Sequence, residues 1–182
     1  RMTTFNLDKG REAAEERLRG SGFSLLKDDR QAGLKLRVRI VMDGSGSTRH
    51  WWLDGTMQEA LQVVLPTAIA VDDDGDMPVA VFNDGRSFKL IAQAMTRTNY
   101  HTYVKDQIVG PDSIPKVPLW GGTDYSPVLR AVLADEGFVK RAGLFGLGPE
   151  AFVPSPNACP TIVYFFTDGE CSPEDKFKTR AL

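Results

Sequence analysis

The stretch that decides the fold reads Val38-Arg39-Ile40-Val41-Met42-Asp43-Gly44-Ser45-Gly46-Ser47. Its first half is short, β-branched and almost continuously apolar, which is typical of a buried strand. Its second half places one carboxylate and two hydroxyls on a glycine-containing turn at the end of that strand. Because Asp43, Ser45 and Ser47 alternate along the chain, their side chains can converge on one point. Carboxylate and hydroxyl oxygens suit Mg²⁺, Mn²⁺ or Ca²⁺, and ligands of open α/β sheets bind at the carboxyl ends of strands. The pattern therefore predicts a divalent-cation site at this edge of the sheet.

The composition is that of a soluble globular domain with a core of its own. The chain has 182 residues, of which 42% are hydrophobic and 25% charged, and its net charge is −2. This balance predicts no basic surface for nucleic acid. Two cysteines are too few for a disulfide scaffold. No leader segment is recognisable, and no apolar run approaches the roughly 20 residues of a membrane span, so we expect a cytoplasmic protein without membrane insertion.

Buried strands alternate with helical patterns along the rest of the chain. Strands are predicted at 36–42, 77–82, 87–92 and 161–166, and helices at 54–69, 99–109 and 125–133, with Asp54 as a helix N-cap. The turn Asn83-Asp84-Gly85 makes the second and third strands an antiparallel hairpin. Residues 44–52 and 138–160 are interpreted as loops. The order predicts an α/β fold with a mainly parallel sheet and one antiparallel edge strand.

The chain divides into an N-terminal arm, residues 1–33, and one domain, residues 34–182. The last predicted strand is followed by only a short segment, although a central strand needs a neighbour on each side. We therefore expect the C-terminal strands to be missing from this chain or to be supplied by another chain. The oligomeric state stays open.

Two further loops carry oxygen ligands to the same edge of the predicted sheet. One is Gly121-Gly122-Thr123, which precedes a helix, and the other is Thr167-Asp168-Gly169, which follows the last strand. Together with the first turn they supply two carboxylates and three hydroxyls, whereas a small hard cation needs about six oxygens, some of them water. Because so few of these ligands are charged, the cation would attract an acidic group from outside.

These three motifs, in this order, resemble the von Willebrand factor A (vWA) family and its metal-ion-dependent adhesion site (MIDAS). The resemblance runs from about Leu36 to Ser172 and implies a Rossmann-like, three-layer sandwich. It implies that the metal, Mg²⁺ with Mn²⁺ and Ca²⁺ as alternatives, is bound directly by Ser45, Ser47 and Thr123. Asp43 and Asp168 would act mostly through water. The family's usual bulky hydrophobe after the second serine is replaced here by Thr48.

A finer resemblance points to one branch of that family. The segments Gly55-Thr56-Met57-Gln58, Asp72-Asp73-Asp74-Gly75 and Phe166-Thr167-Asp168-Gly169-Glu170 are similar to the bacterial tellurium-resistance, TerF-like proteins, which are related to copines. This resemblance implies a role in tellurite or stress resistance.

The favoured function is a non-enzymatic module that captures a carboxylate of a partner protein through its metal. The alternatives are a metal-assisted hydrolase and a scaffold subunit completed by another chain. No histidine or lysine lies in the three loops to act as a general acid or base, which disfavours an enzyme. Trp51 and Trp52 are either a partner-binding rim or packing beneath the loop, and His50 is interpreted as solvated rather than as a ligand.

Overall fold

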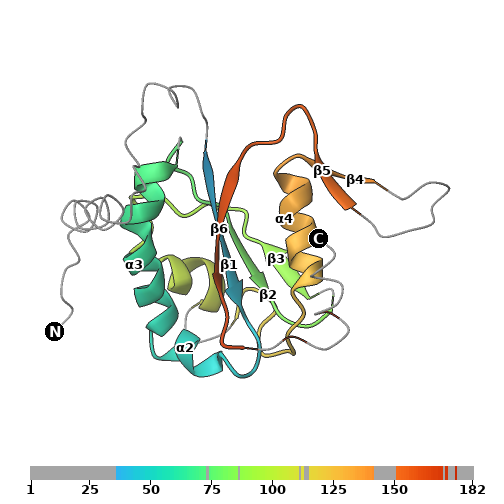
Figure 1. Ribbon diagram of the computed structural model, residues 1–182. Helices are drawn as coiled ribbons and strands as arrows, with labels where there is room; N and C mark the ends of the chain where they lie inside the picture. The colour runs from blue at the N-terminus through green and yellow to red at the C-terminus, as the bar shows by residue number, and fades with distance from the viewer. Residues whose placement is uncertain are drawn as a thin grey trace.

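The predicted first strand forms the centre of the sheet. The computed structural model describes residues 36–72, 74–85, 87–110, 112, 115–141, 151–169, 171 and 175, so the predicted arm lies outside the described residues. Across the sheet the strands are β3 (Phe88–Leu90), β2 (Val79–Phe82), β1 (Arg37–Asp43) and β6 (Thr161–Phe166). β1 runs parallel to β2 and β6, and β2 pairs antiparallel with β3 (Figure 1). The predicted α/β fold, with a mainly parallel sheet and an antiparallel edge strand, is confirmed.

The register brings the carboxyl ends of the parallel strands to the same edge. Asp43 lies opposite Phe82 of β2, and Met42 lies opposite Phe166 of β6. The residues that follow these strands, Gly44, Asn83 and Thr167, therefore begin neighbouring loops. Side chains far apart in the sequence meet at this edge, which lies at the bottom of Figure 1.

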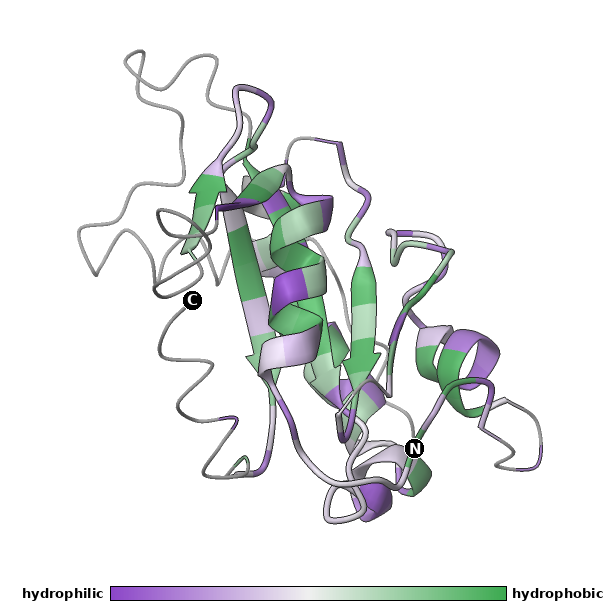
Figure 2. Ribbon diagram, turned by 90° about the vertical axis from the view of Figure 1, so that its right-hand side faces the viewer, coloured by the Kyte–Doolittle hydropathy of each residue, from purple (hydrophilic) through white to green (hydrophobic). Residues whose placement is uncertain are grey.

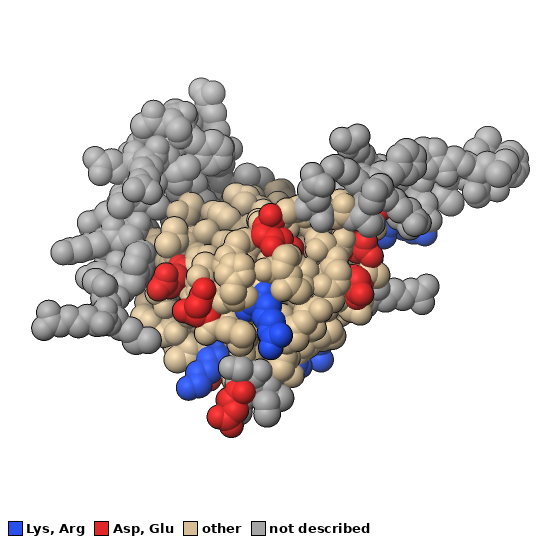
Figure 3. All heavy atoms as spheres, turned by 90° about the horizontal axis from the view of Figure 1, so that it is seen from below, with Lys and Arg blue, Asp and Glu red and all other residues tan. Residues whose placement is uncertain are grey.

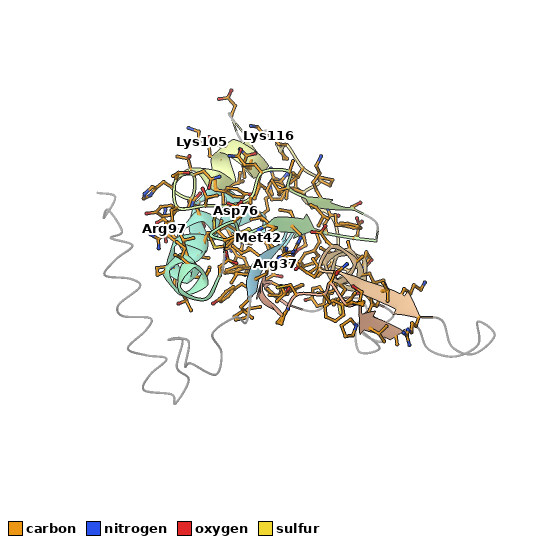
Figure 4. The ribbon with its side chains drawn as sticks, turned by 90° about the horizontal axis from the view of Figure 1, so that it is seen from above. Arg37, Met42, Asp76, Arg97, Lys105 and Lys116 are labelled. Carbon is orange, nitrogen blue, oxygen red and sulfur yellow. The ribbon has the colours of Figure 1, made fainter. Side chains whose placement is uncertain are left out.

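Helices cover the two faces of the sheet and create two apolar clusters. α2 (Arg49–Leu53), α3 (Thr56–Val71) and the π-helix η1 (Val104–Val109) lie on one face, and α4 (Ser126–Asp135) lies on the other (Figure 1). The larger cluster joins alternate residues of β1 and β2 to the first face, and includes Ile40, Met42, Leu61, Leu65, Val79, Val81 and Ile108. The smaller cluster joins the other alternate residues to α4, and consists of Val41, Ala80, Phe82, Val128 and Val132. The hydropathy colouring of Figure 2 shows the strands as the apolar layer behind α4, and in Figure 4 Met42 lies in the interior, with Lys105 and Lys116 at the rim.

The segment 44–52 is not entirely loop, which corrects the sequence prediction. Residues Arg49–Leu53 form α2, and Trp52 on this helix is only 3% exposed. α3 starts one residue later than predicted, because its N-cap is Gly55 in a left-handed conformation at φ 93°. The carboxylate of Asp54 still accepts the N–H of Thr56 at 2.9 Å, and this hydrogen bond lowers the pKa of Asp54.

Two other segments also differ from the prediction. Within residues 99–109, the first part is turn and only Val104–Val109 is helical, in the wider π form. Within 138–160, β4 (Phe138–Arg141) and β5 (Ala151–Pro154) pair as a separate antiparallel ribbon. The glycines and prolines of this region obscured the two strands, because they made the periodicity of the segment weak. Over the described ranges, no helix combines the length and the apolar character needed to cross a membrane.

Candidate metal centre

Asp43 is the last residue of β1 and its side chain is fully buried. Oδ1 accepts the backbone N–H of Ser45 at 2.8 Å, and Oδ2 accepts the hydroxyl of Thr167 at 2.8 Å. The carboxylate is therefore held by its own turn and by the loop after β6. Both donors are neutral, and among the described residues no basic side chain forms an ion pair with Asp43.

The two serine hydroxyls of the turn converge as the alternation predicted. Ser45 Oγ and Ser47 Oγ lie 3.0 Å apart. Ser45 is only 2% exposed, whereas Ser47 is exposed. The pair thus reaches from the buried Asp43 towards the surface, which gives a hard cation two adjacent oxygen ligands that solvent can reach from one side.

The buried side chains of Thr48 and Trp52 hold the backbone of this turn by hydrogen bonds to its carbonyl groups. The Thr48 hydroxyl contacts the carbonyl oxygens of Asp43 at 2.9 Å and Ser45 at 3.0 Å, and the Trp52 indole N–H donates to the Asp43 carbonyl at 2.9 Å. A hydroxyl at position 48 therefore has a structural role where the resembling family has an apolar residue. Of the two readings for the tryptophans, packing beneath the loop describes Trp52, and Trp51 is half-buried against the same core.

The second predicted loop lies directly beside the first. Gly46 N–H donates to the Gly121 carbonyl at 2.8 Å, and Trp120 N–H donates to the Gly44 carbonyl at 2.6 Å. Ser45 and Gly121 form an isolated parallel bridge. These bonds place Gly121-Gly122-Thr123 alongside the serine turn. Thr123 itself is half-buried, and its hydroxyl makes no hydrogen bond with any other described residue.

The third loop is joined to the first through Thr167. Besides donating to Asp43, the Thr167 hydroxyl lies 3.0 Å from the hydroxyl of Tyr125, which also donates to the Gly169 carbonyl. Burial raises the pKa of Tyr125, and the negative charges of Asp43 and Asp168 raise it further. Asp168 is exposed, so it faces the outside of the loop cluster.

Thr167 and Tyr125 contribute to the site although the sequence did not single them out. Thr167 adjoins Asp168 in the quoted motif, so its position was a usable signal. Tyr125 follows the Gly121-Gly122-Thr123 motif, but its distance from the third loop in sequence hid the contact. The two residues connect the second and third loops around Asp43.

The outer rim is formed by α2 and by Trp120. The guanidinium of Arg49 lies 5.4 Å from the centre of the Trp120 ring, a cation–π arrangement. The His50 ring is exposed, and its Nδ1 lies 3.1 Å from the Ser47 carbonyl rather than among the hydroxyls. His50 is thus exposed to solvent, and its exclusion from the metal ligands stays a prediction.

The donor set fits a hard divalent cation better than a transition metal. Within the described ranges, no group of three or more histidine, cysteine or acidic side chains is arranged to hold a metal. The convergent atoms are instead hydroxyl oxygens beside one buried carboxylate that lacks an opposite charge. Oxygen ligands of this kind suit Mg²⁺, Mn²⁺ or Ca²⁺.

Comparison with known proteins agrees with this architecture. The chain is 26% identical over 135 residues to the uncharacterized protein YcbR of Bacillus subtilis (strain 168), an alignment that covers 74% of this chain and 47% of YcbR. The chain thus spans about half the length of this relative. No solved structure gives a significant match. The family model described as "vWA found in TerF C terminus" matches residues 35–142, which is more than half of the chain. This chain therefore belongs to the vWA-TerF-like family.

Proposed function

We propose that this domain binds a partner protein through a divalent cation held at the carboxyl ends of β1 and β6. The observation that carries the proposal is the environment of Asp43. Its carboxylate is fully buried, no described basic side chain neutralises it, and two hydroxyls converge beside it. A buried charge without an opposite charge is strongly disfavoured, and a bound cation supplies that charge.

The five predicted residues divide into two roles in this proposal. Ser45, Ser47 and Thr123 bind the cation directly through their hydroxyls. Asp43 and Asp168 bind through water and supply negative charge. The contacts that support this division are the Ser45–Ser47 approach and the two hydrogen bonds that already occupy the Asp43 oxygens.

Mg²⁺ is the cation we propose, with Mn²⁺ and Ca²⁺ as alternatives. Mg²⁺ keeps several waters and needs only one or two carboxylates, which corresponds to Asp43 and Asp168. With few anionic ligands, the cation retains net positive charge and attracts a carboxylate from a partner. That attraction is the chemistry the cation supplies, and the chain's own residues hold and orient it.

The surface around the site suits an acidic partner. Figure 3 shows this face mostly uncharged, with basic side chains near its middle and acidic side chains around them. Arg49 and His50 of α2 are exposed next to Ser47. Arginine and tryptophan, which meet in the Arg49–Trp120 pair, are both enriched among the residues that contribute most to protein interfaces. We therefore propose a protein partner with an exposed Asp or Glu, and a cytoplasmic role in bacterial tellurite or stress resistance.

We propose that the domain is not an enzyme. The chain has two histidines, His50 and His101. The first contacts a backbone carbonyl and the second stacks on Tyr100 at 3.7 Å, so neither is positioned as a general base for the hydroxyl cluster. Phosphatase and nucleotide-hydrolysis assays with magnesium test the hydrolase alternative. Turnover that is lost in Asp168→Asn would contradict the binding-module proposal.

Isothermal titration of the 182-residue chain with Mg²⁺ tests the site. Ser45→Ala removes one proposed ligand, and we expect the affinity to fall by at least about tenfold, the usual minimum for changes near a metal. Ser155→Ala is the matched control, because Ser155 lies after β5 and its hydroxyl, as far as the structure describes the chain, accepts only the N–H of Asn157. Equal magnesium affinity in Ser45→Ala and the unmodified chain would refute the assignment.

A further inference from the structure

Asn83 follows β2 at the edge of the sheet that carries the proposed metal centre. Its neighbour Phe82 lies opposite Asp43, so Asn83 begins the loop next to the serine turn. Its backbone is fully engaged, because its N–H donates to Ser87 and its carbonyl accepts the N–H of Asp124, both at 2.9 Å. The residue is only 4% exposed. Asn83 is therefore held by its backbone beside the site, although the sequence pattern marked it only as part of the hairpin turn.

The side-chain amide of Asn83 packs directly against the second loop. A carbon attached to Gly121 would lie 2.9 Å from Asn83 Cγ, closer than side-chain carbons approach, and 3.1 Å from its Nδ2, which is tighter than most contacts. Gly121 is the residue that bridges to Ser45 and accepts the N–H of Gly46. The Asn83 amide and the Asp84 carboxylate thus leave little room for a side chain at position 121, next to the backbone that holds the two hydroxyl loops together.

Asn83 Oδ1 is buried and accepts no hydrogen bond from the described residues. Buried side-chain oxygens in native proteins almost always have a partner. Asn99 in the same protein illustrates the usual case, since its Oδ1 accepts the Thr96 N–H and its Nδ2 donates to the Ala94 carbonyl. Among the described side chains, Asn83 Oδ1 is the one buried nitrogen or oxygen atom without a hydrogen-bond partner. Its position beside the metal centre suggests what that partner is.

We propose that Asn83 Oδ1 accepts a hydrogen bond from a water molecule in the hydration shell of the bound cation. This inference rests on the proposed function and adds β2 to the elements that build the site. Mg²⁺ retains several of its waters in proteins, and each bound water donates hydrogen bonds to acceptors around it. Groups that orient the ligands of a metal from outside commonly change its affinity by about 10–100-fold when removed. Asn83 is thus a positioning residue for the cation, acting through water.

Asn83→Leu tests the proposal, because leucine keeps the branched outline of the side chain, although its methyl groups are larger, and removes the acceptor. We expect Mg²⁺ affinity, measured by titration calorimetry of the full chain, to fall by about tenfold. We expect the melting temperature in cation-free buffer to stay the same or to rise, because the variant no longer buries an oxygen without a partner. A residue that only shapes the loop would give the opposite pair of results.

Asn99→Leu is the matched control. It removes an amide whose two hydrogen bonds are satisfied, so it should lower the melting temperature and leave magnesium affinity unchanged. Asn83→Asp replaces the amide oxygen by a carboxylate of the same shape, and we expect tighter Mg²⁺ binding. Weaker binding in Asn83→Asp would mean that the amide presents its NH₂ group to the loops, and would overturn the proposal.

Ser45→Ala in the same titration separates the two proposals. If Ser45→Ala loses magnesium binding and Asn83→Leu retains it, the role of Asn83 is refuted and the metal centre stands. If the unmodified chain and Ser45→Ala behave alike, both proposals fail. Should Asn83→Leu not fold, Asn83→Ala carries the same test without the larger side chain.

Discussion

Arg39 and Asp43 are both buried on β1, but the protein surrounds their charges differently. The guanidinium of Arg39 contacts Glu136, which is also buried, with Nε 2.8 Å and Nη2 2.7 Å from Oε1. It also pairs with Asp135, and the second oxygen of Glu136 accepts the Thr161 hydroxyl at 3.0 Å. The carboxylate of Asp43, in contrast, is held by a backbone N–H and a hydroxyl and by no other group in the described part of the chain.

The difference indicates that Arg39 has a structural role, whereas Asp43 is suited to bind a ligand of opposite charge. Arg39 is neutralised within the chain, by residues at the end of α4, so it ties that helix to the sheet. Asp43 lacks a basic partner among the described residues, and burial of an isolated ion costs several kcal/mol. An external cation would offset that cost. The same strand therefore combines a closed ion pair with an open site at its carboxyl end.

The largest expected effect comes from breaking the closed pair. Glu136→Gln leaves Arg39 buried with only the half-exposed Asp135, and we expect a loss of about 3 kcal/mol in the free energy of unfolding. Urea denaturation measures this loss. Asp135→Asn is the control and should cost less than about 1 kcal/mol, because its carboxylate is half-exposed.

The double variant Arg39→Met/Glu136→Leu sharpens the same comparison. Replacement of a whole buried ion pair by apolar side chains is often neutral or stabilising. We expect this variant to regain most of the stability lost in Glu136→Gln. If it were less stable than Glu136→Gln, the Arg39–Glu136 ion pair would itself stabilise the fold. Neutralisation of a buried charge would then not be the whole difference between Arg39 and Asp43.

The next effect comes from neutralising the open charge. Asp43→Asn removes the buried charge with little change of shape, so the cation-free protein should be as stable as the unmodified chain or more stable. In the unmodified chain, Mg²⁺ at a hundredfold excess over its dissociation constant should add about 2.7 kcal/mol. Denaturation with and without magnesium should show that this gain disappears in Asp43→Asn. A cation-free Asp43→Asn protein that is much less stable would show that Asp43 is structural, like Arg39.

The sequence predicted the sheet well because each buried strand appears in it as a short apolar run. The apolar run before Asp43 and the turn Asn83-Asp84-Gly85 were enough to predict the parallel centre and the antiparallel edge. The π form of η1 and the β4–β5 ribbon were missed, since neither has a distinct period in the sequence. The periodicity of a sequence predicts the structure of a segment from that segment alone, whereas η1 and the β4–β5 ribbon depend on the elements that they pack against.

The site was predictable only as far as its motifs reach. The alternation of Asp43, Ser45 and Ser47 predicted the convergence of their side chains, and the two serine hydroxyls do approach one another. The contacts of Tyr125 with Thr167 and of Asn83 with Gly121 join residues from different loops. No spacing in the sequence encodes such contacts, because they depend on the register of β1 with β2 and β6.

The smallest effect concerns Asp72, which caps the amino-terminal half of β1 from the end of α3. Its Oδ1 accepts the Val38 N–H at 2.8 Å and its Oδ2 accepts the Gly75 N–H at 2.7 Å. Partial burial raises the pKa of Asp72 above its ordinary value of 3.8, and the Asp74 carboxylate raises it further, although the two hydrogen bonds oppose the shift. The folded protein therefore binds this proton more tightly than the unfolded chain, so its stability falls as pH rises from 3.8 through the raised pKa.

Asp72→Asn should abolish this component, and subtraction of the two pH profiles of unfolding free energy cancels the other carboxyl groups. We expect the difference to be small and independent of magnesium, because Asp72 is partly solvated and lies at the opposite end of β1 from the proposed cation. A difference that grew on addition of magnesium would show that the two ends of β1 are coupled rather than independent.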